Sequence, residues 1–313
     1  MSTAGNLRIA VLMGGPSAER EVSLVSGAAC AKALAALGHD VFTVDVGHDL
    51  APVVTELAAR KPDVAFNALH GRFGEDGCIQ GVLELLQIPY THSGVLASAL
   101  AMDKPTARRL FIQAGLACAE GRVCTRAEVT AGHVMAPPYV IKPLNEGSSV
   151  GVEIVFEGDN VPPARDWPFG DRVLVERYIP GREIQVAVMG DRALGAIEIR
   201  PKGRFYDYEA KYTEGKAEHL MPAPIGDQAY AEALRIGAAA HAALGCRGVT
   251  RTDLRYDDTS PASGDVPGRF VVLEVNTQPG MTPLSLVPEI AAHVGIGFGE
   301  LVSWMVEDAS CPR

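Results

Sequence analysis

The stretch FVVLEVNTQPGMT, residues 270–282, decides how the rest of the chain is interpreted. Its β-branched residues predict a strand that ends at the Pro-Gly pair. Because side chains alternate across a strand, Glu274 and Asn276 are expected on one face. The opposite face, which Val271, Leu273 and Val275 would share, is apolar enough to pack on a core. The strand is therefore expected to present oxygen atoms on one face and to be buried on the other.

A second strand is predicted directly upstream, at residues 248–256. The connecting residues 257–268 are rich in Asp, Ser, Pro and Gly, which is typical of a long hairpin loop. This hairpin would place Asp253 beside Glu274 and Asn276. Oxygen ligands without Cys or clustered His suit Mg²⁺ or Mn²⁺ rather than zinc, and Mg²⁺ in such sites usually bridges nucleotide phosphates. The alternative interpretation is a solvated edge strand that carries scattered charge.

Length and composition limit the class of protein. A chain of 313 residues can bury a large core and suits two or three domains better than one. The net charge of -10 disfavours binding to nucleic acid or to an anionic membrane, and no apolar run approaches the roughly 20 residues needed to cross a bilayer. The six cysteines show no CxxC spacing, and the apolar run at residues 7–13 is too short for an export signal, so we expect a cytoplasmic protein.

The first third of the chain alternates between strand and helix patterns. Strands are predicted at residues 7–13, 40–46 and 63–69, helices at residues 21–37, 52–60, 77–86 and 94–100, and a short strand at residues 88–90. This order predicts an open parallel sheet, which binds ligands at the carboxyl ends of its strands. On the first helix the expected apolar stripe consists of Val22, Val25, Ala29, Ala33 and Leu37.

Two loops leave the carboxyl ends of these strands, at residues 14–21 (GGPSAERE) and 70–77 (HGRFGEDG). The Gly-Gly turn could cradle a phosphate, but the GxGxxG spacing is absent. Glu19 suits an amino-acid ligand, and its alternative role is a favourable charge in the first turn of a helix. For His70 the alternative is a loop histidine whose hydrogen bonds are satisfied within the protein.

The composition changes near residue 102, where we expect a domain boundary. Residues 138–152 predict a strand, a Gly-Ser-Ser loop and another strand, so backbone N–H groups and Lys142 could contact phosphates. The alternative is a tight hairpin with a solvated lysine. Residues 176–181 look like a crossover between domains, where a backbone edge could bind a purine and Glu183 a ribose. The remaining predictions are helices at residues 102–114 and 228–244, a strand at residues 173–177, a hairpin of residues 182–189 and 194–200, and a lid at residues 204–216.

Five ordered motifs support a family resemblance. In chain order they are GGPSAEREVSL, LHGRFGEDG, KPLNEGSSVGV, YEAKY and the two strands with the predicted metal ligands. With these motifs the sequence resembles the D-alanine:D-alanine ligases of the ATP-grasp superfamily, over almost the whole chain. The resemblance implies an α/β fold (α+β overall) with three domains around one cleft. These would be an open parallel substrate-binding domain with a dimer contact (residues 1–101), a central ATP-grasp domain (102–181) and a C-terminal catalytic ATP-grasp domain (182–313).

The resemblance also implies roles for individual residues. The nucleotide would be held at its phosphates by Lys104, Lys142 and Lys211, with Ser148 also at the ATP, and at its adenosine by Glu176, Ile179 and Glu183. Two Mg²⁺ or Mn²⁺ ions would be bound by Asp253, Glu274 and Asn276. A hydrogen-bonded trio that closes the lid would consist of Glu19, Ser148 and Tyr212.

The D-alanine site implied by the resemblance has three parts. Glu19 would receive the ammonium group of the first D-alanine, with His70 close by. Arg251 and the amide of Gly280 would stabilise the tetrahedral intermediate. The carboxylate of the second D-alanine would be held by Ser285 and Leu286.

The implied function is ATP-dependent formation of D-alanyl-D-alanine through an acyl phosphate, for peptidoglycan synthesis, by a homodimer. The chain departs from the family at Gln278, which replaces a frequent Ser or Leu, and at Pro283-Leu284, which replaces a Ser-His pair. These changes leave open another carboxylate-amine ligase, or a ligase that takes D-lactate or D-serine as its second substrate. A different class, a catalytically silent sensor of nucleotide or amino acid, would not need all three metal ligands.

Overall fold

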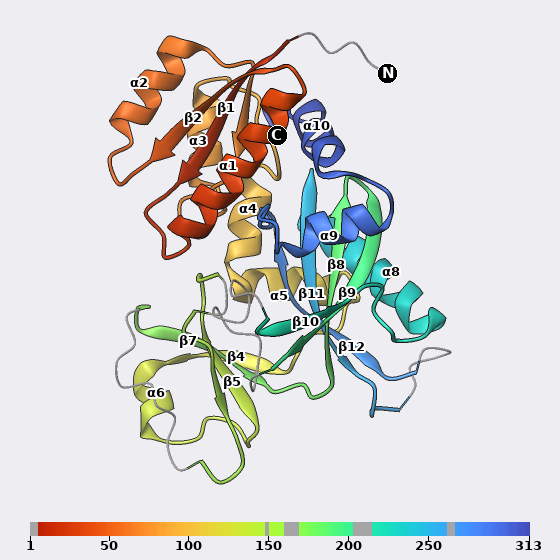
Figure 1. The fold of residues 1–313 in the computed structure, drawn as a ribbon. Helices are drawn as coiled ribbons and strands as arrows, with labels where there is room; N and C mark the ends of the chain where they lie inside the picture. Colours follow the sequence, from red (N-terminus) through yellow and green to blue (C-terminus); the bar gives the residue numbers. More distant parts are fainter. Residues whose placement is uncertain (1–5, 148–149, 160–168, 203–214, 262–266) are drawn as a thin grey trace.

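A computed structural model of the chain describes residues 6–147, 150–159, 169–202, 215–261 and 267–313. The described residues form three separate sheets with helices packed around them (Figure 1). The predicted residues Ser148, Lys211 and Tyr212, and most of the predicted lid, lie outside the described residues.

The first sheet has the strand order β2-β1-β3 and is parallel throughout. This arrangement confirms the open parallel sheet expected from the alternating pattern. The predicted strand at residues 88–90 is reduced to isolated bridges of Tyr90, one with Ala65 and one with Ser310. The elements of this region are β1 (Arg8–Gly14), α1 (Arg20–Ala36), β2 (Asp40–Val46), α2 (Ala51–Arg60), β3 (Val64–Asn67), α3 (Cys78–Leu85) and α4 (Val95–Met102).

The apolar stripe predicted for α1 is wrong in part. Val25 is 51% exposed and Leu37 is 49% exposed. The helix instead turns small residues toward the sheet: a Cβ on Gly27 would lie 2.5 Å from the Cβ of Met13. Ser23 is buried and donates a hydrogen bond of 2.7 Å from its hydroxyl to the Ala68 carbonyl. Hydrophobic periodicity missed this face because close approach to the strand, rather than apolar area, decides it.

The second sheet is antiparallel with the order β4-β7-β5-β6. Helix α5 (Lys104–Gln113) leads into it and begins at Asp103, whose carboxylate accepts a hydrogen bond of 2.9 Å from the Thr106 N–H. That carboxylate is an N-cap, which explains why the predicted helix begins here. The other elements are β4 (Gly121–Thr125), α6 (Arg126–Ala131), β5 (Tyr139–Pro143), β6 (Glu153–Val155) and β7 (Arg172–Arg177).

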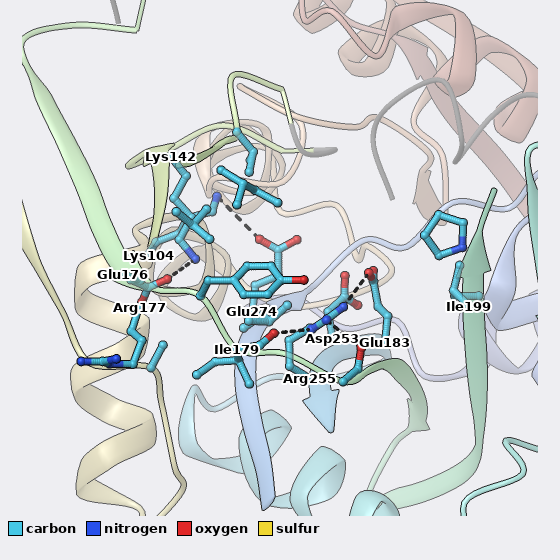
Figure 2. Close-up of a pocket in the computed structure, with 18 of the residues that line it drawn as sticks. Lys104, Lys142, Glu176, Arg177, Ile179, Glu183, Ile199, Asp253, Arg255 and Glu274 are labelled. Carbon is cyan, nitrogen blue, oxygen red and sulfur yellow. Dashed lines mark hydrogen bonds and ion pairs between the residues drawn. The ribbon is translucent and has the colours of Figure 1, made fainter. Parts of the chain in front are cut away.

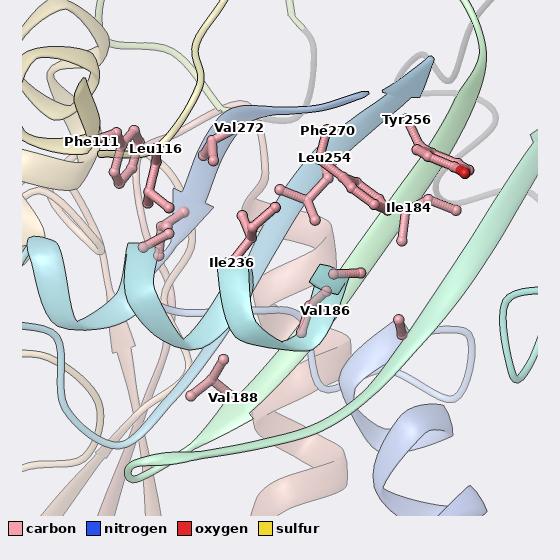
Figure 3. Packing of buried hydrophobic residues seen from close by; sticks show 14 of the residues in the cluster. Phe111, Leu116, Ile184, Val186, Val188, Ile236, Leu254, Tyr256, Phe270 and Val272 are labelled. Carbon is pink, nitrogen blue, oxygen red and sulfur yellow. The ribbon is translucent and has the colours of Figure 1, made fainter. Parts of the chain in front are cut away.

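The third sheet is antiparallel with the order β10-β9-β8-β11-β12. Helix α8 covers one of its faces, and Figure 3 shows Ile236 of this helix facing Val186 and Leu254 of the sheet. The elements are β8 (Arg182–Met189), β9 (Arg192–Pro201), β10 (Ala217–Leu220), α8 (Asp227–Ala243), β11 (Val249–Asp257), β12 (Arg269–Asn276), α9 (Leu286–His293) and α10 (Phe298–Glu307).

A β-bulge interrupts the pairing of β11 with β12. Because of it, the side chains of β12 do not alternate between the two faces of the sheet as predicted. Asp253 pairs with Glu274 but the next residue, Leu254, pairs with Val272, which leaves Leu273 unpaired. The extra residue shifts the register by one position. Val272 and Val275 therefore both belong to the core under α8, whereas Leu273 lines the cleft described below. The prediction that Val271, Leu273 and Val275 share one face is wrong.

Over the part of the chain that the structure describes, no single helix is both long and apolar enough to span a membrane. One pair of helices, α9 and α10, passes the same test of length and composition only when taken together, and it is bent by 105° at its break.

The core under α8 gives a stability prediction. Leu254 is fully buried in this core, so Leu254→Ala should lower the free energy of unfolding by about 2 to 5 kcal/mol through lost apolar burial and a cavity. Leu85→Ala is the matched control, because Leu85 is 87% exposed and its truncation should change that free energy by less than about 0.5 kcal/mol. Urea denaturation of both variants measures the difference. Equal effects of the two substitutions would contradict the assignment of Leu254 to the core.

Candidate active site

A cleft of about 410 Å³ lies between the second and third sheets (Figure 2). This volume is typical of small-molecule sites. Strands β5 and β7 contribute to one wall, and β8, β9, β11 and β12 contribute to the other. The cleft brings together the predicted residues Lys104, Lys142, Glu176, Ile179, Glu183, Asp253 and Glu274.

Lysine 142 and Glu176 form a buried ion pair on the wall made by β5 and β7. The Lys142 Nζ lies 2.5 Å from one carboxylate oxygen of Glu176, and the Arg108 Nε lies 3.4 Å from the other. A buried charge is costly unless it is paired, so the two cations and the carboxylate hold one another in place. Around Glu176 two positive groups thus face one carboxylate, and of these two Lys142 lines the cleft, where its ammonium group can contact an anionic ligand.

Arginine 255 organises the connection between β7 and β8. Its guanidinium donates hydrogen bonds to the carbonyl oxygens of Ile179, at 3.1 Å, and Gly181, at 2.8 Å. It also lies 3.7 Å from the Glu183 carboxylate. Sequence reasoning missed Arg255, although its position two residues after Asp253 on one strand was a signal that both face the cleft.

A second cluster of charge lines the far part of the cleft. The buried Glu198 carboxylate accepts hydrogen bonds of 3.0 Å from the Nε atoms of Arg182 and Arg200. Burial opposes ionisation of Glu198, but the hydrogen bonds from the two arginines outweigh it and lower the pKa of this carboxyl group. This part of the cleft therefore also has two arginines for one ionised carboxylate.

A smaller pocket of about 50 Å³ adjoins the cleft and shares Lys104, Glu146 and Glu274 with it. The loops after β1 and β3 meet the ends of β11 and β12 here, at the carboxyl edge of the parallel sheet. Predicted residues in its lining are Glu19, His70, Arg251, Asn276 and Gly280, with Glu75 and Glu146 in addition. The predicted residues Ser285 and Leu286 lie outside this lining: Ser285 precedes α9, and the Leu286 side chain is buried in a core.

His70 is buried, and both of its ring nitrogens have partners. Nδ1 lies 3.1 Å from the carbonyl oxygen of Gln278, which can only accept, so this nitrogen carries the proton. Nε2 lies 3.2 Å from the Ser26 hydroxyl and accepts from it. Burial lowers the pKa of His70, which keeps the imidazole neutral, although the nearby Glu19 carboxylate opposes this effect. These contacts fix the ring as a wall of the pocket.

Glu19 and Glu75 give the small pocket its acidic character. The Glu75 carboxylate accepts a hydrogen bond of 3.0 Å from the Gly71 N–H. Burial raises the pKa of Glu75 to about 8, and the neighbouring Glu19 carboxylate adds to the rise. A Cβ on Gly71 would lie 2.6 Å from Glu19 Oε2, and one on Gly147 would lie 2.9 Å from it, so glycine lets both loops approach Glu19. Because Glu75 is mostly protonated at neutral pH, the carboxylate of this pair that would attract an ammonium group is that of Glu19. Sequence reasoning did not single out Glu75.

The end of the β11–β12 hairpin carries alternating acid, base and amide groups. Pairing places Asp253 opposite Glu274 and Arg251 opposite Asn276, as the predicted hairpin requires. The Arg251 guanidinium donates to both oxygens of Asp253, at 2.7 and 2.9 Å. The Lys104 ammonium lies 3.6 Å from Glu274.

The hairpin end offers only oxygen donors to a metal ion. Within the described ranges, no group of three or more His, Cys, Asp and Glu side chains is arranged to hold a metal. The oxygen donors at this hairpin end are the carboxylates of Asp253 and Glu274 and the amide oxygen of Asn276. This donor set fits a hard cation such as Mg²⁺.

The raised pKa of Glu75 predicts a pH-dependent stability. An unfolded glutamate loses its proton near pH 4.5, whereas native Glu75 keeps it up to about pH 8, so the unfolded state binds fewer protons between these values. The contribution of Glu75 to stability is therefore complete below pH 4.5 and is lost as the pH rises to about 8. Glu75→Gln cannot ionise, so its stability relative to the native chain should increase over this range in urea denaturation. A difference that is independent of pH would contradict the prediction.

Comparison with known proteins agrees with the resemblance. Residues 110–307 match the family model described as the D-ala D-ala ligase C-terminus, and residues 50–93 match that of the N-terminus. A D-alanine–D-alanine ligase of Paramagnetospirillum magneticum is 63% identical over 306 residues, which cover 97% of this chain and 99% of the relative.

Two solved structures are also similar to the fold. The D-alanine–D-alanine ligase of Bacillus anthracis complexed with ATP has a TM-score of 0.77 and 26% identity, and the match covers 96% of this chain and 97% of that one. The VanG D-Ala:D-Ser ligase of Enterococcus faecalis has a TM-score of 0.78 and 28% identity, over 97% and 99% of the two chains. The architecture, the residues gathered in the two pockets and these matches together show that the chain belongs to the D-alanine–D-alanine ligase family.

Proposed function

We propose that the protein joins two molecules of D-alanine into D-alanyl-D-alanine at the expense of ATP, for peptidoglycan synthesis. The observation that carries this proposal is the junction of two unlike pockets. A larger cleft, whose lining includes Lys104 and Lys142, opens beside a smaller pocket that has more acidic than basic side chains, and Lys104 and Glu274 are among the residues that line both. A nucleotide in the first and an amino acid in the second would bring a phosphoryl donor next to a carboxylate.

The chemistry needs charge and position rather than an enzyme nucleophile. A carboxylate is a poor electrophile, so the γ-phosphoryl group of ATP is transferred to an oxygen of the first D-alanine, which gives ADP and an acyl phosphate. The amine of the second D-alanine then attacks the acyl carbon, the C–O bond to phosphate breaks, and the ammonium proton is released. Cations aimed at the transferring group are what such a reaction requires.

In this proposal the larger cleft holds ATP. Lys104, Lys142 and Lys211 contact the phosphates, Ser148 also contacts the ATP, and the adenosine is held by Glu176, Ile179 and Glu183; of these residues Ser148 and Lys211 lie outside the described ones. The contacts of Arg255 support this assignment, because they fix the Ile179 carbonyl and keep Glu183 beside it. The ATP complex of the Bacillus anthracis relative supports the choice of nucleotide.

Two Mg²⁺ or Mn²⁺ ions belong at Asp253, Glu274 and Asn276 in the same proposal. When bound there, the ions would neutralise charge on the phosphates. Their support is the all-oxygen donor set on one face of the hairpin. Arg251 and Lys104 stand beside the two carboxylates and balance their charge in this structure.

The smaller pocket is assigned to D-alanine. Glu19 receives the ammonium group of the first D-alanine beside the neutral ring of His70, and Arg251 with the Gly280 N–H stabilises the tetrahedral intermediate. Glu19 also forms the closing trio with Ser148 and Tyr212. The second carboxylate is held by Ser285 and Leu286; for Leu286 only the backbone N–H can serve, because its side chain is buried in a core.

The proposal includes three domains, at residues 1–101, 102–181 and 182–313, and a homodimer in the cytoplasm. Each of these ranges contains one of the three sheets, and isolated bridges from Cys118 to Val272 and from Tyr90 to Ser310 cross between the ranges. The exposed Leu96 on α4 supports a dimer contact in the first range. Six free cysteines agree with a reducing compartment.

A second candidate is a ligase that takes D-serine or D-lactate as the second substrate. Its support is the likeness to the D-Ala:D-Ser ligase and the departures at Gln278 and Pro283-Leu284. The backbone of Gln278 contacts His70 and Asn276, which line the small pocket, and Pro283-Leu284 follows Gly280 of the same lining in the sequence.

A substrate panel tests the proposed reaction. With ATP, Mg²⁺ and D-alanine the protein should release phosphate and form D-alanyl-D-alanine, whereas L-alanine should give neither. Adding D-serine or D-lactate to D-alanine should leave D-alanyl-D-alanine as the main product by mass spectrometry. Phosphate release with D-lactate but not with D-alanine as the second substrate would refute the proposal.

Glu274→Gln is the matching active-site variant in the same assay. It keeps the shape of the side chain but removes the negative charge of a proposed metal ligand that lines both pockets, so turnover should fall to the background rate with an unchanged circular dichroism spectrum. Near-normal turnover would refute the role of Glu274.

A further inference from the structure

Gln278 is a buried residue whose side chain joins two distant parts of the chain. It follows β12, and its Oε1 accepts a hydrogen bond of 2.7 Å from the Nδ2 of Asn67, at the end of β3. Its Nε2 donates to the carbonyl oxygens of Leu69 and, at 3.3 Å, Gly74, in the loop that follows β3. The side chain thus connects the end of β12, in the third sheet, to the loop that follows β3, in the first sheet.

The backbone of Gln278 holds two walls of the small pocket. Its carbonyl oxygen accepts from His70 Nδ1 at 3.1 Å, and its N–H donates to the Asn276 Oδ1 at 2.8 Å. Gln278 does not itself line the pocket, whereas His70 and Asn276 do. Any effect of Gln278 on a bound amino acid must therefore act through these neighbours.

Three buried side-chain amides converge on the Gly74 carbonyl. Asn67 donates to it at 3.1 Å, Gln80 at 2.9 Å and Gln278 at 3.3 Å. Asn67 and Gln80 belong to the same region as the loop, while Gln278 reaches it from the third sheet. Buried amide networks are rigid when satisfied and costly when broken. The contribution that Gln278 makes is therefore a link between sheets.

We propose that Gln278 is a positioning residue of the D-alanine site. Its side-chain amide fixes the loop at residues 69–75, which carries His70 and Glu75, against the strand end that carries Asn276 and Gly280. The inference rests on the proposed function, since it assigns D-alanine to the small pocket. The two walls of that pocket belong to different sheets. Without the side-chain hydrogen bonds of Gln278, we expect these walls to shift relative to each other.

Gln278→Met tests the link, because methionine keeps the length and volume of the side chain but removes its hydrogen-bonding atoms. We expect KM for D-alanine to rise about tenfold, which corresponds to about 1.4 kcal/mol and lies within the usual cost of broken buried hydrogen bonds. KM for ATP should stay within about twofold, because Gln278 lines neither pocket and its contacts lead to the small one.

Gln80→Met is the matched control. Gln80 is equally buried and donates to the same Gly74 carbonyl, but it does so from α3, within the region of the loop. Both KM values should therefore stay within about twofold of the native values. A similar rise in KM for D-alanine in both variants, or an equal rise for ATP in Gln278→Met, would overturn the inference, because either result indicates general loosening.

Hydrogen exchange measured without substrates separates this inference from the proposed reaction. Amides of residues 68–76 should exchange faster in Gln278→Met than in the native chain or in Gln80→Met. Unchanged exchange would overturn the link whatever the activity, and absence of D-alanine-dependent turnover in the native chain would refute the reaction alone. If Gln278→Met does not fold, Gln278→Leu serves in the same comparisons.

Discussion

The antiparallel pairing of β11 with β12 is the constraint on which the site depends. It sets Asp253 opposite Glu274 and Arg251 opposite Asn276, so two carboxylates, an arginine and an amide stand at one strand end. The bulge at Leu273 lets this charged face coexist with a buried one, since Val272 and Val275 both reach the core beneath α8. A regular strand could not turn both of these valines to the same face.

Charge balance explains how so many ionisable groups can lie close together. The ion pairs of Lys142 with Glu176 and of Arg251 with Asp253 each compensate a largely buried charge. Where compensation is missing, protonation changes instead: burial beside Glu19 raises the pKa of Glu75, and burial lowers that of His70. A ligand with phosphates and an ammonium group would exchange these internal pairs for its own.

The sequence predicted those features of the fold and site that depend on residues close together in the chain. The parallel sheet, the β11–β12 hairpin and the position of Glu19 and His70 at strand ends follow from strand alternation and from loops at strand ends, whereas their grouping with Arg251 was implied by the family resemblance. The bulge could not be predicted, because it depends on the register of the partner strand.

Residues that act through distant contacts were harder to find. Arg255 matters through carbonyl groups more than 70 residues away, and Gln278 through Asn67, which is 211 residues away. On α1, hydrophobic periodicity favoured Val25, which is exposed, because contact with the sheet needed small side chains there. The spacing of residues along the chain does not predict contacts of this kind.

The central claim is that the β11–β12 hairpin joins a nucleotide site to an amino-acid site. A crystal structure with a non-hydrolysable ATP analogue, Mg²⁺ and D-alanine tests it most directly. The account predicts metal density between the analogue's phosphates and Asp253, Glu274 and Asn276, with D-alanine beside Glu19. Nucleotide bound outside the cleft, or metal held by other residues, would contradict it.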